Sequence, residues 1–233
     1  MINSINQTAT LVLTNEEIIE ENSSKSINRK YKVIKRSFDI FFALLGLIAL
    51  IPITVIVKLV TLLSGDTKSI FYSQTRIGKD GKEFKLYKFR SMIPNADEVL
   101  KKYLKENMKA AQEYRKYKKL TNDPRITKIG KVLRKTSLDE VPQVLNILKG
   151  DMSIIGNRPY LPREKYDMDD YYEDIIKTKP GLTGFWQCSL RSRGTFEERM
   201  KMEKYYSNNA GLKFDIGIFF KTVEMVVLKK DAK

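Results

Sequence analysis

One long apolar stretch interrupts a mostly mixed pattern of polar and apolar positions. Residues 40–57, IFFALLGLIALIPITVIV, contain one hydroxyl side chain, Thr54, and no charge. As a straight helix these 18 residues would span about 27 Å, close to the thickness of a bilayer core. A polar stretch of over 30 residues precedes them and no small-residue cleavage site follows, which argues against a cleaved signal peptide. The pattern therefore predicts a membrane segment.

This segment has a proline inside it and basic residues on both sides. Pro52 removes one helix hydrogen bond and clashes with the preceding turn, so we expect a bend there. The flanking basic residues are Arg29, Lys30, Lys32, Lys35 and Arg36 before the segment, and Lys58, Lys68, Arg76 and Lys79 after it. Since basic flanks mark the cytoplasmic side of a membrane, both ends are expected on one face. A re-entrant helix–break–helix hairpin hinged at Pro52 fits both features, and a kinked single span is the open alternative.

The periodicity after this segment predicts further elements. Residues 70–92 alternate around Asp80-Gly81, a dipeptide that favours a tight turn, and so predict a β-hairpin. Apolar residues recur at helical spacing across 95–120, opposite a lysine-rich face, and again across the shorter stretch 127–135. Residues 214–228 are apolar with few charges, which suits a helix at the membrane interface and equally a helix in the core.

The order of these elements predicts one catalytic domain with a membrane anchor. At 233 residues the chain is long enough for one well-buried domain and short for two. We expect a polar N-terminal extension at 1–30 that is loosely ordered or peripheral, a membrane-anchoring re-entrant helix at 31–66, and a cytoplasmic catalytic domain at 67–233. The predicted fold class is α+β and helix-dominated: a re-entrant membrane helix hairpin, a small β-hairpin and amphipathic interfacial helices.

Charge and composition narrow the chemistry. The chain has 43 Lys and Arg against 28 Asp and Glu, a formal charge of +15, which implies attraction to nucleic acid, anionic lipid or a phosphorylated substrate. The basic residues are spread along the chain without a nucleic-acid recognition module, so no nucleic acid is expected as a partner. Because histidine is absent and Cys188 is the single cysteine, a histidine base, a histidine-ligated metal and an internal disulfide are excluded. Acid, base and nucleophile must come from carboxylates, Lys, Tyr, Ser or Cys188.

The most informative polar residues are two adjacent carboxylates. Pro142 is tolerated only in the first turn of a helix, so a helix is expected to begin near Leu138 or Asp139. Asp139 and Glu140 would then lie at the positive end of that helix, which favours an ionised carboxylate and attracts phosphate. Such a carboxylate can act as a nucleophile or bind Mg²⁺. Ser137-x-x-Glu140 also matches a capping box, which would make both residues purely structural.

Basic residues elsewhere in the chain favour a phosphorylated ligand for this pair. The guanidinium group binds phosphate oxygens through paired hydrogen bonds, and an arginine beside a proline loses less freedom on binding. The candidate substrate-binding residues are Lys88, Arg90, Arg125, Arg134 and Arg158.

At these residues the chain resembles a known family, the bacterial sugar transferases, which are polyprenyl-phosphate phosphoglycosyl transferases of the monotopic type. The resemblance covers about residues 32–231. It rests on ordered strings: Lys35-Arg36-x-x-Asp39, Gln74-x-Arg76-x-Gly78-x-x-Gly81, Lys88-Phe89-Arg90-Ser91-Met92, Ser137-Leu138-Asp139-Glu140-x-Pro142-Gln143, Leu148-Lys149-Gly150-Asp151-Met152-Ser153 and Lys179-Pro180-Gly181-Leu182-Thr183-Gly184. Two departures are Asn157, where the family commonly has proline, and the Cys188-Ser189-Leu190 that follows Gln187.

The resemblance implies a reaction and roles for residues. Asp139 would attack the β-phosphate of a UDP-sugar, release UMP and carry the sugar phosphate covalently until polyprenyl phosphate takes it. Glu140 would handle the acceptor or the metal, and Mg²⁺ near Asp139 would neutralise the diphosphate. Arg134 and Arg158 match the phosphate-contacting arginines of the family. Lys88 and Arg90 match its basic hairpin end, and Pro52 its membrane hinge.

The resemblance also implies partners and a location. The partners would be a UDP-sugar donor, undecaprenyl (polyprenyl) phosphate as acceptor and membrane lipids. The catalytic domain would face the cytoplasm at the inner membrane, in the first membrane step of cell-surface polysaccharide or glycoconjugate synthesis. The residues leave open which sugar is transferred, the pathway, and whether the chain is a monomer or a homodimer. An alternative reading is a non-catalytic basic membrane adaptor that binds anionic lipid or a partner protein.

Overall fold

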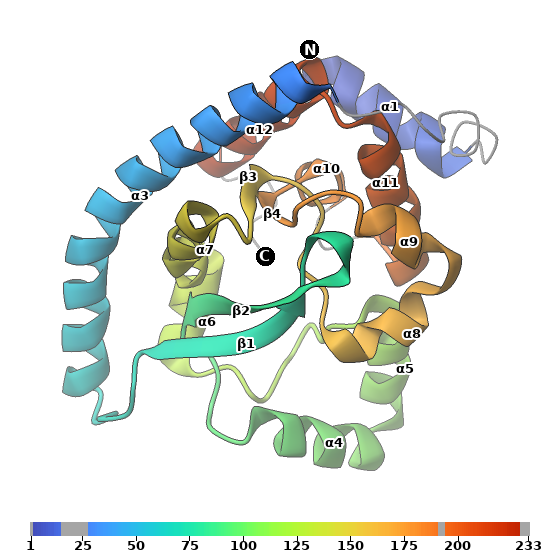
Figure 1. Cartoon of the computed structure of the whole chain (residues 1–233). Coiled ribbons are helices and arrows are strands. Elements are labelled where there is room, and N and C mark those ends of the chain that lie inside the picture. The colour runs from blue at the N-terminus through green and yellow to red at the C-terminus, as the bar shows by residue number, and fades with distance from the viewer. Residues whose placement is uncertain (1, 15–27, 191–193, 229–233) are drawn as a thin grey trace.

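The computed structural model describes residues 2–14, 28–190 and 194–228 (Figure 1). Its helices are α1 (Ile2–Thr14), α3 (Arg29–Leu63), α4 (Ala96–Glu106), α5 (Met108–Tyr117), α6 (Lys128–Lys135), α7 (Val144–Lys149), α8 (Lys165–Met168), α9 (Tyr172–Ile175), α10 (Phe185–Ser189), α11 (Phe196–Asn209) and α12 (Leu212–Val227). Short 3-10 helices are η1 (Lys79–Gly81), η2 (Leu138–Gln143), η3 (Pro162–Glu164) and η4 (Asp169–Tyr171). The strands are β1 (Phe71–Ile77), β2 (Glu83–Phe89), β3 (Ser153–Ile155) and β4 (Gly181–Thr183). The predicted helix-dominated fold with a small β-hairpin is confirmed.

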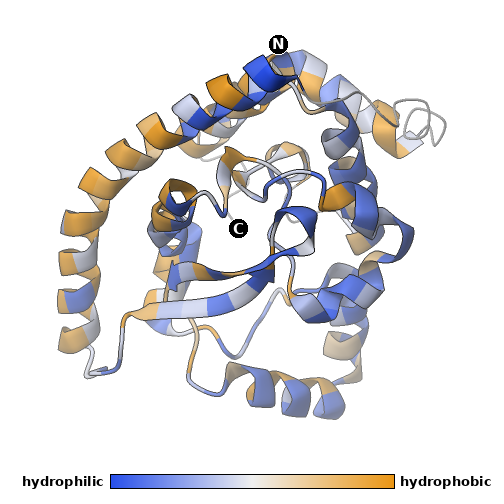
Figure 2. Cartoon of the chain, viewed as in Figure 1, coloured by the Kyte–Doolittle hydropathy of each residue, from blue (hydrophilic) through white to orange (hydrophobic). Residues whose placement is uncertain are grey.

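The predicted membrane segment lies within α3, a helix of 35 residues. Many of its large apolar side chains are exposed, and Figure 2 shows hydrophobic residues along much of its length. Among the described residues it is the one helix long and apolar enough to cross a membrane. The helix is continuous across Pro52, so a helix–break–helix hairpin at this residue is not confirmed. Figure 1 shows instead that α3 curves as it follows one side of the domain.

Three polar residues near the start of α3 fasten it to the rest of the domain. Arg36 donates to two carbonyls in the last turn of α7, at 2.6 and 2.9 Å, where a helix leaves its carbonyls unpaired. Asp39 is buried and accepts from the Ser153 hydroxyl and from the next backbone N–H of β3, both at 2.8 Å. Lys35 pairs with Asp215 of α12. The long apolar helix and the rest of the domain are therefore one unit.

The hairpin is held against α7 by one buried amide. β1 and β2 pair antiparallel, with Tyr72 opposite Lys88. Asn146 of α7 accepts from the backbone N–H of Tyr87 at 3.0 Å and donates to the carbonyl of Lys85 at 2.7 Å. These two bonds use backbone groups of β2 that β1 does not reach, so Asn146 fixes where the end of β2 lies relative to η2 and α7.

The N-terminal extension differs from the expectation of a loosely ordered or peripheral segment. Residues 2–14 form α1, and Ile5, Ala9 and Val12 on one face of it are buried in an apolar cluster with residues of α10, α11 and α12. The expectation is wrong for this helix because these three positions share one face at helical spacing. The remainder of the predicted extension, at 15–27, lies outside the described residues.

The helical predictions hold with one exception. The stretches 127–135 and 214–228 form α6 and α12. The stretch 95–120 forms two helices, because Asn107 adopts an extended conformation between α4 and α5. The Asn107 side chain accepts from the Ala110 backbone N–H at 3.0 Å and so caps α5.

Replacing Asn146 by alanine tests the docking of the hairpin. Asn146→Ala removes two hydrogen bonds of a fully buried side chain to the backbone of β2, which should lower the free energy of unfolding by about 1–3 kcal/mol. The measurement is urea unfolding of the detergent-solubilised protein. Asn122→Ala changes an exposed asparagine and should stay within about 0.5 kcal/mol of the wild type. Equal stability of the two variants would contradict the assignment.

Candidate active site

The two carboxylates follow a sharp reversal of the chain. After α6, Ser137 adopts a left-handed conformation with φ 58°, which few residues other than glycine adopt, and η2 starts at Leu138. The predicted helix start near Leu138 is confirmed, although residues 138–143 form a 3-10 helix and the α-helix begins only at Val144. The Ser137 side chain makes no capping hydrogen bond, so the capping-box reading is wrong. The pair therefore has no capping role that would explain it.

Lys88 of β2 brings the carboxylates into one site. Its Nζ donates to Glu140 Oε1 at 2.7 Å and lies 3.8 Å from Asp139 Oδ2. The Asp139 side chain is only 8% exposed, whereas that of Glu140 is 38% exposed. One carboxylate is thus withdrawn into the protein and the other is open to solvent or a ligand, with a single ammonium group between them.

The surroundings move the two carboxyl pKa values in opposite directions. Burial raises the pKa of Asp139, and the nearby charge of Glu140 raises it further, while Lys88 and Arg134 oppose both effects. Burial also acts to raise the pKa of Glu140, but the charge and hydrogen bond of Lys88, together with the charge of Arg158, outweigh it and lower that pKa. Neighbouring carboxyls with separated pKa values can take different roles in one reaction.

Two of the predicted arginines lie around this pair. Arg134, at the end of α6, donates from Nε to the Ser91 hydroxyl at 2.9 Å, and its charge acts on Asp139. Arg158, which follows β3, acts on Glu140, and its buried Nε has no hydrogen-bond partner among the described residues. Of the predicted cations, Lys88 of β2 thus contacts the carboxylates directly, while Arg134 of α6 and Arg158 after β3 act on them through their charge.

The other two predicted cations are engaged elsewhere. Arg90 donates to Asp66 at 2.8 Å and to the Ser69 carbonyl at 2.7 Å, which ties the hairpin to the chain that leaves α3. Arg125 is buried and makes two hydrogen bonds to the Asp123 carboxylate, at 2.8 and 2.6 Å. Both guanidinium groups thus have structural partners, and neither contacts the carboxylate pair.

Sequence reasoning missed a buried polar group behind Arg158. Glu203 of α11 accepts from the Arg158 backbone N–H at 2.9 Å, and Arg199, one turn earlier, stacks on the Trp186 ring with its guanidinium carbon 4.0 Å from the centroid. Arg76 was counted above among the basic flank of the membrane segment, yet its side chain points into the domain and donates to the Pro159 carbonyl at 3.0 Å. The sequence does not distinguish these buried charged residues from charged residues at the surface. Which side chains of α11 are buried depends on the segments that pack against it.

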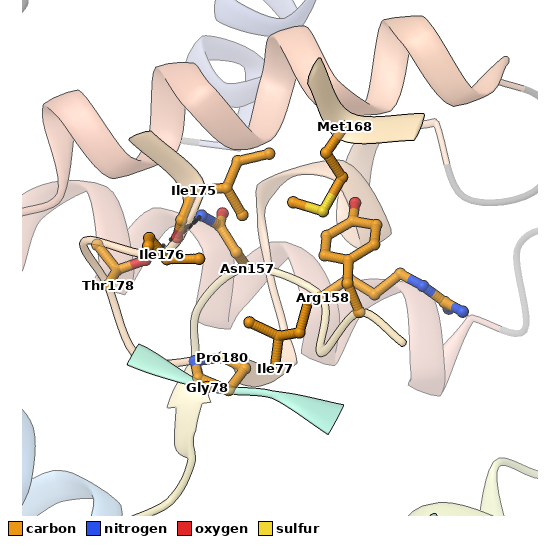
Figure 3. A pocket seen from close by; sticks show the side chains of 10 residues that line it. Ile77, Gly78, Asn157, Arg158, Met168, Ile175, Ile176, Thr178 and Pro180 are labelled. Atoms are coloured by element: carbon orange, nitrogen blue, oxygen red, sulfur yellow. Dashed lines mark hydrogen bonds between the residues drawn. The ribbon is translucent and has the colours of Figure 1, made fainter. Parts of the chain in front are cut away.

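Arg158 also borders a small hollow (Figure 3). Its wall includes Ile77, Ile175 and Met168, and the Asn157 amide crosses it to reach the Ile175 carbonyl at 3.2 Å. In Figure 3 the Arg158 guanidinium extends away from these side chains. The hollow is apolar and does not include the carboxylates, so it is not where a charged substrate would react.

The donor set is compatible with a magnesium ion that the substrate helps to bind. No group of three or more Cys, Asp or Glu residues that could hold a metal occurs within residues 2–14, 28–190 and 194–228. Asp139 and Glu140 nevertheless offer carboxylate oxygens side by side. Mg²⁺ is commonly bound through one or two carboxylates, with phosphate oxygens and water completing its shell. The site thus fits the ion only together with a phosphate.

Comparison with known proteins agrees with this geometry. The profile described as "Bacterial sugar transferase" matches residues 30–229. The chain is 44% identical over 198 residues to the exopolysaccharide production protein ExoY of Sinorhizobium fredii, covering 85% of this chain and 87% of that protein. It is 40% identical over 229 residues to the undecaprenyl-phosphate galactose phosphotransferase of Salmonella typhimurium, covering 97% of this chain and 47% of that protein.

A third relative is the UDP-glucose:undecaprenyl-phosphate glucose-1-phosphate transferase of Escherichia coli, 36% identical over 201 residues that cover 82% of this chain and 40% of that protein. The chain thus spans about half the length, or less, of the last two relatives and most of the length of the first. The match extends from the membrane helix through the acidic pair to α12, so the resemblance inferred from the sequence strings is confirmed. The chain belongs to the bacterial sugar transferase family.

Proposed function

We propose that this protein transfers a sugar-1-phosphate from a UDP-sugar to undecaprenyl phosphate, through a covalent intermediate on Asp139. The observation that carries the proposal is the arrangement of Asp139 and Glu140 around the Lys88 ammonium, on a turn that packs against the membrane helix. Two relatives support the proposal by their names, one an undecaprenyl-phosphate galactose phosphotransferase and the other a UDP-glucose:undecaprenyl-phosphate glucose-1-phosphate transferase.

The reaction proceeds in two displacements at one phosphorus. An Asp139 oxygen attacks the β-phosphorus of the UDP-sugar, and the bond from this phosphorus to the bridging oxygen breaks, so UMP leaves with the electron pair. A phosphate oxygen of the polyprenyl phosphate then attacks the same phosphorus. The bond to Asp139 breaks, which restores the carboxylate and yields a sugar diphosphate on the lipid. No other group is consumed.

The residues around Asp139 stabilise the negative charge of the phosphates that react there. Lys88 lies between the carboxylates and lowers the repulsion that a phosphate would meet there. Arg158, whose charge acts on Glu140, supplies positive charge for a phosphate of the donor. Glu140, with its lowered pKa and partial exposure, stays ionised and faces the second substrate. Magnesium, held by Asp139 and Glu140 with the diphosphate, would neutralise the phosphate charge.

The membrane position of the site follows from its neighbours. Leu138 and Val141, on either side of the pair, pack in one apolar cluster with Leu50 and Val57 of α3. The carboxylates are therefore fixed close to the helix that enters the bilayer, where the phosphate of a polyprenyl lipid lies. We propose that the curved α3 enters one leaflet and returns, so that the catalytic domain stays on the cytoplasmic face of the inner membrane, and that α12 lies at the interface.

Replacing the nucleophile is the direct test of the reaction. Asp139→Asn removes the attacking carboxylate with little change in size, so UMP release from a UDP-sugar in the presence of undecaprenyl phosphate and Mg²⁺ should fall by about 10³-fold or more. Asp80→Asn, at an exposed left-handed position of the hairpin tip, is the matched control and should keep wild-type activity. Full activity of Asp139→Asn, or no UMP from any sugar donor with the wild type, would instead favour the membrane-adaptor reading.

The pH profile tests the electrostatics of the pair. Asp139 attacks only when ionised, so activity should fall on the acid side as the pH drops through its raised pKa. Lys88→Met removes the positive charge that opposes this rise, so the acid limb should move to higher pH, together with a loss of activity. The measurement is kcat/KM against pH. An acid limb that stays in place or moves to lower pH would show that Lys88 does not act on the nucleophile.

The topology of α3 can be tested with single cysteines. Cys188 is buried and burial raises the pKa of its thiol to about 12, so it should not react with a maleimide. Lys32→Cys and Lys68→Cys place exposed thiols before and after the apolar part of α3. In sealed inside-out vesicles both should react with an impermeant maleimide added outside. Reaction of only one of them would indicate a single span.

A further inference from the structure

The Asn157 side chain and the Arg158 backbone are both bound to one face of α11. The Asn157 side chain donates to the Ser207 hydroxyl at 2.6 Å and to the Ile175 carbonyl at 3.2 Å. The Arg158 backbone N–H donates to Glu203 Oε2 at 2.9 Å. Glu203 and Ser207 are four residues apart and therefore lie on the same face of the helix. The chain that carries Arg158 is thus clamped to α11 at two points.

The chain on the other side of Arg158 is fixed to the hairpin. Arg76 of β1 donates to the Pro159 carbonyl at 3.0 Å, and the Ile77 backbone N–H donates to the Tyr160 carbonyl at 2.8 Å. The arginine therefore stands between α11 and β1. Because β1 and β2 are one hairpin, the same sheet that carries Lys88 also fixes the far side of Arg158.

Glu203 is an unusual residue for a purely structural bond. It is 1% exposed, and burial raises the pKa of its carboxyl to about 8 against the opposing charges of Arg199 and Arg158. A buried carboxyl costs stability unless it is well paired, and its Oε1 has no hydrogen-bond partner among the described residues. A neutral side chain could fill this space at lower cost, so the contact with Arg158 is the function that the geometry offers for it.

We propose that Glu203 is a positioning residue for the transfer reaction, holding the Arg158 backbone so that the charge of its guanidinium acts on Glu140. The inference rests on the proposed function, since it assigns to Arg158 a phosphate of the donor. Asn157 takes part in the same clamp through its side chain. A proline at position 157 would restrict the backbone by its ring. In this chain the hydrogen bonds of Asn157, Glu203 and Ser207 restrict the backbone there instead.

The test is a double-mutant cycle on kcat/KM for UMP release. Glu203→Ala removes the bond to Arg158 and should lower kcat/KM on the order of 10²-fold, with the larger part in kcat, because a misplaced arginine still attracts the donor but no longer aligns it. Glu203→Gln keeps an oxygen acceptor and should recover most of that loss. In an Arg158→Ala background, Glu203→Ala should cost less than about threefold more.

Two further variants keep the test decisive. Asn157→Ala removes the other half of the clamp without removing a charge, so it should show the same dependence on Arg158 even if Glu203→Ala does not fold. Glu197→Gln, on the exposed side of α11 beside Lys201, is the matched control and should stay within about twofold of the wild type. Thermal melting of each variant separates loss of fold from loss of alignment.

The outcomes distinguish this inference from the proposed function. If the wild type releases UMP and Asp139→Asn does not, the proposed function stands. If, in addition, the losses from Arg158→Ala and from Glu203→Ala or Asn157→Ala simply multiply, Glu203 supports the fold alone and the inference is overturned. If the wild type releases no UMP, the proposed function fails and the inference fails with it.

Discussion

The contact of Lys88 with two neighbouring carboxylates is the interaction on which the proposed chemistry depends. Two ionised carboxyls placed side by side repel each other and would repel a diphosphate still more strongly. An ammonium 2.7 Å from Glu140 and 3.8 Å from Asp139 reduces both effects. It does so unevenly, because Asp139 is buried and Glu140 is half open. In the proposed reaction, this unequal environment would let one carboxyl act as nucleophile while its neighbour remains charged.

That contact is held close to the long apolar helix by a set of polar anchors. Arg36 and Asp39 fasten α3 to the end of α7 and to β3, while Asn146 fastens α7 to β2. The turn that carries Asp139 lies directly before α7. The long apolar helix, Asp139 and Lys88 are therefore connected through one short helix, and displacement of any of them would disturb the others.

The sequence singled out the acidic pair and several basic residues, but it did not show which of these cations would meet the pair. The hairpin pattern put Lys88 at the end of a strand, and only the structure places it against Glu140 and Asp139. Arg90, two residues later, is also basic and directly follows the same strand, yet Asp66 binds it. Arg125 is likewise held by Asp123, two residues before it. Local partners of this kind decide which cations remain available, and residue type alone does not reveal them.

By itself, the sequence determined the long apolar helix, the hairpin, the helix start at the acidic pair and the absence of histidine chemistry, because each follows from periodicity, from proline geometry or from composition. Only the tertiary structure decided that Ser137 does not cap, that α1 joins the core, and that Glu203 reaches the backbone of Arg158. These outcomes depend on contacts between segments far apart in the chain, where packing sets which polar groups are buried and which partner each one meets.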